Sequence, residues 1–303
     1  MITFFKRTIQ NKFIKRASEL KVGSWVNVVN PSPSELDYLV KELGLDRRNL
    51  ESGLDQNELP RLDFVKRDIY VFTKTIPRIE TREIETYLIV ISKNFILTLS
   101  QTEPAFIKKI LRGKTKFITT QKLKCLIELF SLIDEKFQKV TIDIVKSVQG
   151  QRKLTTEFEE KELNVLLERE DILNNLISSY YRMNLLYGQI TRKIEFFEQD
   201  KEIIEDLIVE ATQGFNLCKS SLTTISNIRN YYVVLLSNKL NKVITILTVF
   251  TVLISLPAAI SGIYGMNILL PLQEDPSAFY YLLCLIGVIW LSFILYLRKR
   301  KII

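Results

Sequence analysis

Two long apolar segments near the C-terminus dominate the hydropathy pattern of this chain. Residues 243–262 and residues 279–297 contain no charged side chain. At about 1.5 Å per residue, a helix of either length crosses a hydrocarbon core of about 30 Å. Charged residues flank both segments, a pattern that favours membrane helices over the buried core helices of a soluble protein. We therefore predict transmembrane helices at 243–262 and at 279–297.

The distribution of basic residues predicts the orientation of these helices. Basic side chains precede the first span and follow the second, at Lys239, Lys242, Arg298, Lys299, Arg300 and Lys301. Since positive charge marks the cytoplasmic side of a membrane, we expect both termini to be cytoplasmic and the protein to lie in the plasma membrane. Residues 263–278 then form an external loop, made acidic by Glu274 and Asp275, and residues 298–303 form a basic cytoplasmic tail.

Residues 1–120 have the pattern of a cytoplasmic α/β domain. Residues 24–29 alternate like a strand, and Ser34 is expected to cap an amphipathic helix that ends at Gly44. Segments rich in β-branched and aromatic residues predict strands at 68–76, 85–91 and 95–99, with a hairpin turn at 92–94. The basic segment 1–16 has two interpretations, a solvated arm or part of an organellar transit peptide.

From about residue 121 the pattern becomes helical and stays so almost to the membrane. One helix is predicted over 121–149, and a second from a capping box at Thr156 and Glu159 to Phe197, giving a helical hairpin within 121–199. A third, capped by Asp200, is expected to run through residue 262 as a stalk roughly 95 Å long that becomes the first membrane span. Such a helix is not stable alone in water, so it must pack against other helices or against copies of itself.

Composition excludes several classes of site. The chain has 303 residues, a net charge of +8, no histidine and three cysteines without a CxxC pair. Catalysis by imidazole, a histidine zinc site and a disulfide framework are therefore not expected. No Walker A motif is present, and no nucleophile and base form a recognisable motif. We predict that the protein is not an enzyme and does not bind nucleic acid.

One stripe of the first span is polar or small. Steps of three and four residues connect Asn241, Thr245, Thr248, Thr251, Ser255, Ala259 and Gly262. In hydrocarbon such a stripe faces either water or a neighbouring helix, so a pore lining and a packing seam both remain open. Pro257 lies near the middle of the span, where it is expected to kink the helix as a hinge or through packing alone.

The sequence after this span resembles the CorA family of magnesium channels, the two-transmembrane GMN transporters. The motif is Tyr264-Gly265-Met266-Asn267, at the outer end of the first of two C-terminal spans. Further similar segments are Trp25-Val26-Asn27-Val28, Leu50-Glu51 followed by Leu54 and Pro60-Arg61, Ser92-Lys93-Asn94-Phe95, and Ser237-Asn238-Lys239. The resemblance therefore covers nearly the whole chain.

The resemblance implies a homopentamer with an α/β funnel domain, in which the first spans line one pore and Mg²⁺ passes largely hydrated. It implies that Asn267 forms the external selectivity ring, within the filter motif 264–267, and that Asn241 also faces the pore. It further implies a regulatory Mg²⁺ site between subunits, formed by an acidic residue after Leu50-Glu51 of one subunit and Asp206 on the long helix of the next subunit, that holds the channel closed. Because Ser52 stands there in this chain, that site is weaker, uses Glu51, or is absent.

The leading hypothesis is thus a channel for Mg²⁺, with Co²⁺ and Ni²⁺ as surrogates, gated by internal Mg²⁺. At about 2.3 kcal/mol per charge per 100 mV, a divalent cation gains roughly 4.6 kcal/mol on moving into a negative cell. Two alternatives remain: a zinc transporter of similar fold, and a membrane-tethered helical scaffold that conducts nothing. The expected partners are lipid, divalent cations and copies of the chain itself.

Overall fold

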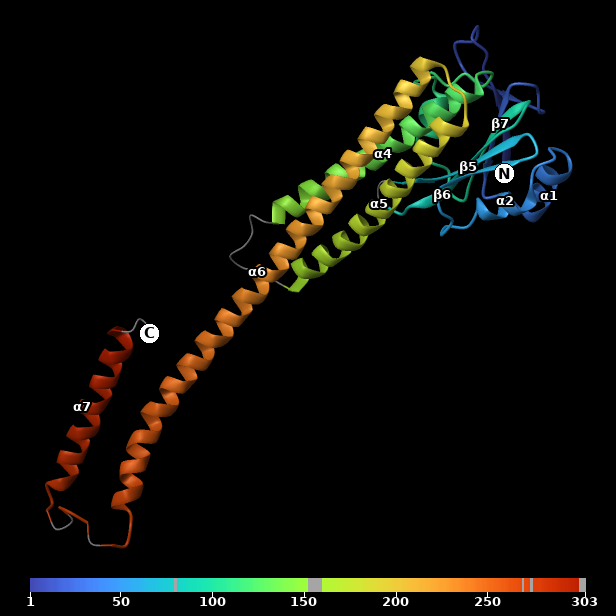
Figure 1. Cartoon of the computed structure of the whole chain (residues 1–303). Helices are drawn as coiled ribbons and strands as arrows, with labels where there is room; N and C mark the ends of the chain where they lie inside the picture. Colours follow the sequence, from blue (N-terminus) through green and yellow to red (C-terminus); the bar gives the residue numbers. More distant parts are fainter. Residues whose placement is uncertain (79–80, 152–159, 269, 273–274, 300–303) are drawn as a thin grey trace. The chain divides into compact units, whose positions relative to one another are not determined.

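The computed structural model describes residues 1–78, 81–151, 160–268, 270–272 and 275–299 (Figure 1). The chain divides into two compact units, Met1–Ile228 and Arg229–Ile303. Helix α6 (Glu198–Tyr264) begins in the first unit and ends in the second. The capping box expected at 156–159, Glu274, Arg300 and Lys301 lie outside the described residues.

The first unit is built on a mixed seven-stranded sheet with the order β2-β1-β3-β7-β6-β5-β4. Its strands are β1 (Ile2–Lys6), β2 (Lys15–Ala17), β3 (Ser24–Val29), β4 (Arg61–Val65), β5 (Asp68–Thr75), β6 (Glu85–Ile91) and β7 (Phe95–Ser100). Strands β3 and β7 are parallel, and the other neighbours are antiparallel. The strands predicted at 24–29, 68–76, 85–91 and 95–99 are confirmed to within a residue, and so is the hairpin turn between β6 and β7.

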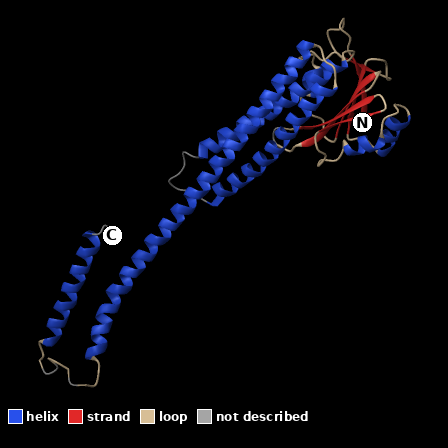
Figure 2. Cartoon of the chain, viewed as in Figure 1, coloured by secondary structure: helices blue, strands red, loops and turns tan. Residues whose placement is uncertain are grey.

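Helices cover both faces of this sheet, as Figure 2 shows. One face packs α1 (Pro33–Lys41) and α2 (Arg47–Ser52) against residues such as Val26 and Leu97. The other packs α4 (Lys122–Gln151), α5 (Glu160–Lys193) and the first part of α6 against residues such as Trp25 and Ile96. A short helix, α3 (Ile107–Leu111), joins the second core. Successive side chains of a strand point to opposite faces of the sheet, so neighbouring residues contribute to two separate hydrophobic cores.

The N-terminal segment corrects the expectation of a solvated arm or transit peptide. It contains β1 and β2, and β1 pairs with β3 from Ile2 to Lys6. The ring centroid of Phe5 lies 5.1 Å from that of Trp25, and both side chains are buried. The segment is therefore part of the sheet. Strand β4 was likewise not predicted, because only its partner β5 reveals it.

Two helix caps differ from the sequence prediction. Ser32, not Ser34, caps α1: its Oγ accepts from Glu35 N, while the Glu35 carboxylate accepts from Ser32 N. At α6 the expected cap Asp200 lies within the first turn, because Phe197 O already accepts from Asp200 N and Lys201 N. Helix α5 ends at Lys193, earlier than the predicted Phe197.

The second unit holds the end of α6 and helix α7 (Ala278–Lys299). Each contains a window apolar enough to cross a membrane, and neither window is buried inside the chain. Helix α6 continues through Pro257 to Tyr264. In the apolar part of α6, residues 243–262, partial burial is found at Thr245, Val249, Leu253, Leu256, Pro257 and Ile260. This half-buried face differs from most of the polar stripe, whose residues are exposed.

Candidate functional site

The GMN motif lies directly after the end of α6. Gly265 N donates to Ser261 O at 2.9 Å and Met266 N donates to Ile263 O at 3.2 Å, so the chain leaves the helix through a tight turn. A Cβ on Gly265 would lie 3.3 Å from Ser261 O, which favours glycine in this turn. The exposed Asn267 amide makes no hydrogen bond among the described residues. Its oxygen and its N–H groups are therefore available to water.

Local hydrogen bonds hold the described part of the loop between α6 and α7. The Tyr264 hydroxyl donates to Pro271 O at 3.4 Å. Asp275 Oδ1 accepts from the hydroxyl and the backbone N of Ser277, at 2.6 and 2.8 Å. These hydrogen bonds lower the pKa of Asp275, so this carboxylate is negatively charged at neutral pH.

Hydroxyl groups along the polar stripe donate to their own helix. Thr245, Thr248 and Thr251 each donate to the carbonyl four residues earlier, at 2.8 to 2.9 Å. Ser255 donates to Val252 O at 3.2 Å. The hydroxyl protons are therefore engaged in hydrogen bonds to backbone carbonyls of α6, while the hydroxyl oxygens can still accept hydrogen bonds. Asn241, Ala259 and Gly262 are also exposed, whereas Thr245 is half-buried.

The residues expected to bind regulatory Mg²⁺ are not brought together within one chain. Glu51 is exposed and accepts from Arg47 Nε at 2.8 Å, while Arg47 Nη1 donates to Asp37 at 2.6 Å. These two carboxylates, with Glu51 the larger influence, raise the pKa of Arg47. Asp206 is exposed, and no contact joins it to Glu51 among the described residues. In the described part of the chain, no group of three or more acidic, cysteine or histidine side chains could hold a metal.

The loop that follows Glu51 is clamped to the sheet through its carbonyls, a feature that the sequence did not reveal. Gln101 Nε2 donates to Leu54 O at 2.5 Å, and Lys74 Nζ donates to Gln56 O at 2.6 Å. Thr86 Oγ1 donates to Asp55 O, also at 2.6 Å. Burial lowers the pKa of Lys74. These contacts fix the segment that follows α2, and thus the end of the helix that carries Glu51.

A buried carboxyl group on α4, also not predicted, lies beside the exposed carboxyl group of Glu210 on α6. Asp134 on α4 is fully buried, and its Oδ2 accepts from Gln138 at 2.8 Å. Desolvation by burial, together with the neighbouring carboxyl group of Glu210 on α6, raises the pKa of Asp134 to about 8. At neutral pH Asp134 is therefore mostly in its neutral form.

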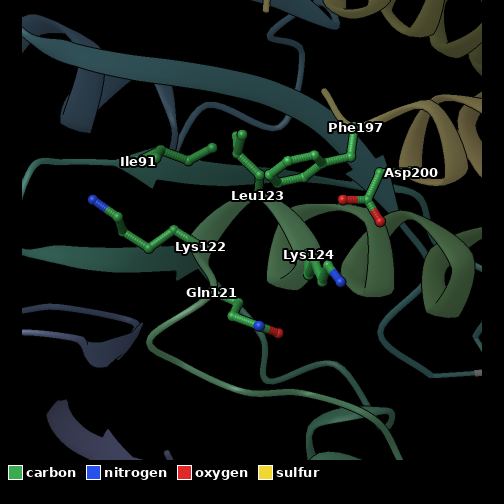
Figure 3. A pocket seen from close by; sticks show the side chains of 7 residues that line it. All are labelled: Ile91, Gln121, Lys122, Leu123, Lys124, Phe197 and Asp200. Atoms are coloured by element: carbon green, nitrogen blue, oxygen red, sulfur yellow. The ribbon is translucent and has the colours of Figure 1, made fainter. Parts of the chain in front are cut away.

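A cavity of about 450 Å³ lies where the sheet meets the beginnings of α4 and α6 (Figure 3). Its lining is Ile91, Gln121, Lys122, Leu123, Lys124, Phe197 and Asp200. Lys122 Nζ donates to Ser92 O and Lys93 O and so ties α4 to the β6–β7 turn. Asp200 is only 8% exposed. One carboxylate among apolar and basic side chains does not form a divalent cation site.

Sequence and fold comparisons agree on one family. Residues 21–299 match the family described as CorA-like Mg²⁺ transporter protein. The chain is 26% identical over 294 residues to the cobalt/magnesium transport protein CorA of Methanocaldococcus jannaschii, covering 91% of this chain and 90% of that protein. It is 20% identical over 299 residues to the protein of the same name from Thermotoga maritima, covering 92% of this chain and 83% of the other.

The fold agrees with a solved structure over its full length. The complete structure of the CorA magnesium transporter from Methanocaldococcus jannaschii superposes with a TM-score of 0.86 at 21% identity. The superposition covers 99% of this chain and 98% of that one. The α/β unit, the long helix and the second apolar helix all have counterparts in that fold.

Proposed function

The chain belongs to the CorA-like Mg²⁺ transporter family, and on that premise we propose that it is a homopentameric channel in the plasma membrane. Mg²⁺ passes inward through a central pore, and Co²⁺ and Ni²⁺ pass as surrogates. Both termini are cytoplasmic and residues 263–278 form the external mouth. The names of two relatives, both cobalt/magnesium transport proteins, support Mg²⁺ and Co²⁺ as the ions.

The observation that carries the proposal is that, within the described part of the chain, the exposed amide of Asn267 is unpaired. Its amide is exposed, uncharged and without a partner among the described residues, immediately after the first membrane helix. Mg²⁺ loses its waters reluctantly, so a ring of amides that accepts hydrogen bonds from those waters recognises the ion without dehydrating it. A ring of carboxylates would hold a divalent ion more tightly and slow its release. Tyr264, Gly265 and Met266 complete the filter by setting the turn that presents Asn267.

The polar stripe of α6 supports a hydrated pathway below this ring. Its hydroxyl oxygens keep their acceptor sites, and most of its residues lie away from the half-buried face of the helix. Five copies of the stripe around one axis give a pore lined by acceptors and small residues. Asn241 provides a second amide ring at the cytoplasmic end.

Regulation by internal Mg²⁺ is the finer part of the proposal. Asp206 has no partner among the described residues and is free to bind a cation at a subunit interface. Glu51, in contrast, already pairs with Arg47. A regulatory Mg²⁺ must therefore compete with an arginine for that carboxylate, and Ser52 supplies only a hydroxyl. We expect inhibition by internal Mg²⁺ to be present but weak.

The test is divalent cation flux into proteoliposomes that contain the full chain. Wild type is expected to take up Mg²⁺ and Co²⁺ under an inside-negative potential. Asn267→Ala should reduce Mg²⁺ uptake at least tenfold without preventing assembly, because it removes the amide ring but no core packing. Ile268→Ala, at the exposed neighbouring position, is the matched control and should retain uptake. Normal Mg²⁺ flux through Asn267→Ala would overturn the selectivity assignment. If the wild type took up Zn²⁺ in preference to Mg²⁺, a zinc transporter would be favoured. If it took up no divalent cation, a non-conducting scaffold would be favoured.

A further inference from the structure

One side chain of α7 makes a hydrogen bond to the backbone of α6. Trp290 Nε1 donates to Leu253 O at 3.0 Å. Leu253 lies four residues before Pro257, which is inside the helix. In an α-helix the N–H of residue 257 would donate to this carbonyl, but proline has no N–H. Trp290 therefore reaches the one carbonyl of α6 that Pro257 deprives of its partner.

Nearby hydroxyl groups do not serve this carbonyl. Ser255 Oγ donates to Val252 O and Thr251 Oγ1 donates to Leu247 O. Leu253 lies on the half-buried face of α6, away from the stripe. Within hydrocarbon no water is available, so a freed carbonyl must find a donor on a neighbouring helix. The indole N–H, which is a donor only, meets that need.

We propose that Trp290 is a positioning residue for the pore helix: its indole N–H replaces the hydrogen bond that Pro257 removes and holds residues 253–257 of α6 against α7. The same turn carries Ser255, between Thr251 and Ala259 of the stripe. Helix α7 thereby fixes the position of the conducting face at this depth. The link to conduction rests on the proposed function, whereas the link between Trp290 and Pro257 does not.

The test is a double-mutant cycle of Trp290→Phe and Pro257→Ala in the full chain. Phenylalanine keeps an aromatic ring but removes the donor, and alanine restores the helical N–H. In an SDS titration, Trp290→Phe should lower the folded-to-unfolded ratio about tenfold with Pro257 present, since a carbonyl in hydrocarbon then loses its donor. In the Pro257→Ala background the same change should cost less than twofold. Tyr281→Phe, which removes a donor from another exposed ring of α7, is the control and should have no effect.

Two further measurements separate positioning from simple stability. Trp25 and Trp290 are the two tryptophans of the chain, so ¹⁵N-indole labelling gives two resonances. Pro257→Ala should shift the Trp290 indole resonance and leave that of Trp25, which donates to Thr98, unchanged. Mg²⁺ flux per folded channel should fall several-fold in Trp290→Phe and recover in the double variant.

The outcomes separate this assignment from the proposed function. If Trp290→Phe lowered stability equally with proline or alanine at position 257, the indole ring would act through its volume and not through its N–H. If the substitution had no effect in either background, the hydrogen bond to Leu253 O would not contribute to stability. Either result overturns the assignment. Unchanged flux per folded channel would overturn its role in positioning the pore. If wild type carried no Mg²⁺, the proposed function would fail, while the SDS and NMR measurements would still test the hydrogen bond.

Discussion

Replacing Gly214 with alanine should destabilise the first unit, although alanine is the better helix former. Gly214 lies on α6 where the helix meets Tyr180 of α5. A Cβ at this position would overlap Tyr180 Cζ and lie 2.7 Å from the hydroxyl oxygen of that tyrosine. The tyrosine cannot easily move, because its ring is fully buried and its hydroxyl is 3.0 Å from Thr141 Oγ1 in a hydrogen bond.

The expected magnitude follows from three terms. Alanine gains about 1 kcal/mol over glycine in a helix interior. Forcing the ring aside costs about 1–3 kcal/mol, and loss of the hydrogen bond to Thr141 costs about 1 kcal/mol more. The net loss is about 1–3 kcal/mol, which in a unit of this size lowers the melting temperature by roughly 3–10 °C.

Gly188 on α5 provides the matched control. A Cβ there would meet only the flexible end of Arg192, at 3.5 Å. Gly188→Ala should therefore stabilise the protein by up to about 1 kcal/mol. Thermal unfolding of the full chain in detergent, followed by circular dichroism at 222 nm, measures both variants. If Gly214→Ala raised the melting temperature as Gly188→Ala does, the close packing of α5 on α6 would be wrong.

Three other predictions concern titration, the pore and regulation. Asp134 has a folded pKa of about 8 against its ordinary 3.8, so its contribution to stability is full below about pH 4 and is lost as pH rises through 8. Asp134→Asn should therefore flatten the pH dependence of stability measured with denaturant over that range, and an unchanged slope would refute the raised pKa of Asp134. Thr248→Leu, on the stripe, should reduce Mg²⁺ flux several-fold while Val243→Leu, on another exposed face, should not; equal effects would indicate a packing seam. Ser52→Asp should strengthen inhibition of flux by internal Mg²⁺ and Asp206→Ala should weaken it modestly; an inhibition curve unmoved by Ser52→Asp would argue against this site.

Local sequence patterns were sufficient for the elements with strong periodicity. Strands β5, β6 and β7 are confirmed to within a residue, and helices α4 and α6 and the second apolar segment, in α7, lie within about two residues of their predicted bounds. Strands β1 and β2 were missed because they are short and lie within a basic segment, and their pairing partners define them. Whether such a segment forms a strand depends on its tertiary pairing, which intrinsic β-propensity does not describe.

Contacts between residues far apart in the sequence could not be predicted from local patterns, because they form only when the chain is folded. Asp134 and Glu210 look like ordinary polar positions on separate helices, and only tertiary packing buries Asp134 beside the Glu210 carboxyl group. Trp290 resembles any aromatic residue of a membrane span until Leu253 O is found at its indole nitrogen. In contrast, the importance of Asn267 came from a motif, and the structure adds that its amide is exposed beyond the helix end.

The voltage at which Mg²⁺ current reverses tests the channel proposal most directly. The full chain is reconstituted in a planar bilayer with Mg²⁺ as the only permeant cation, and the external concentration is varied at constant pH. A passive pathway for a doubly charged ion predicts a reversal potential that moves by about 30 mV for each tenfold change in Mg²⁺ gradient. A reversal potential that does not follow the Mg²⁺ gradient, or that moves with a proton gradient instead, would contradict a passive Mg²⁺ channel.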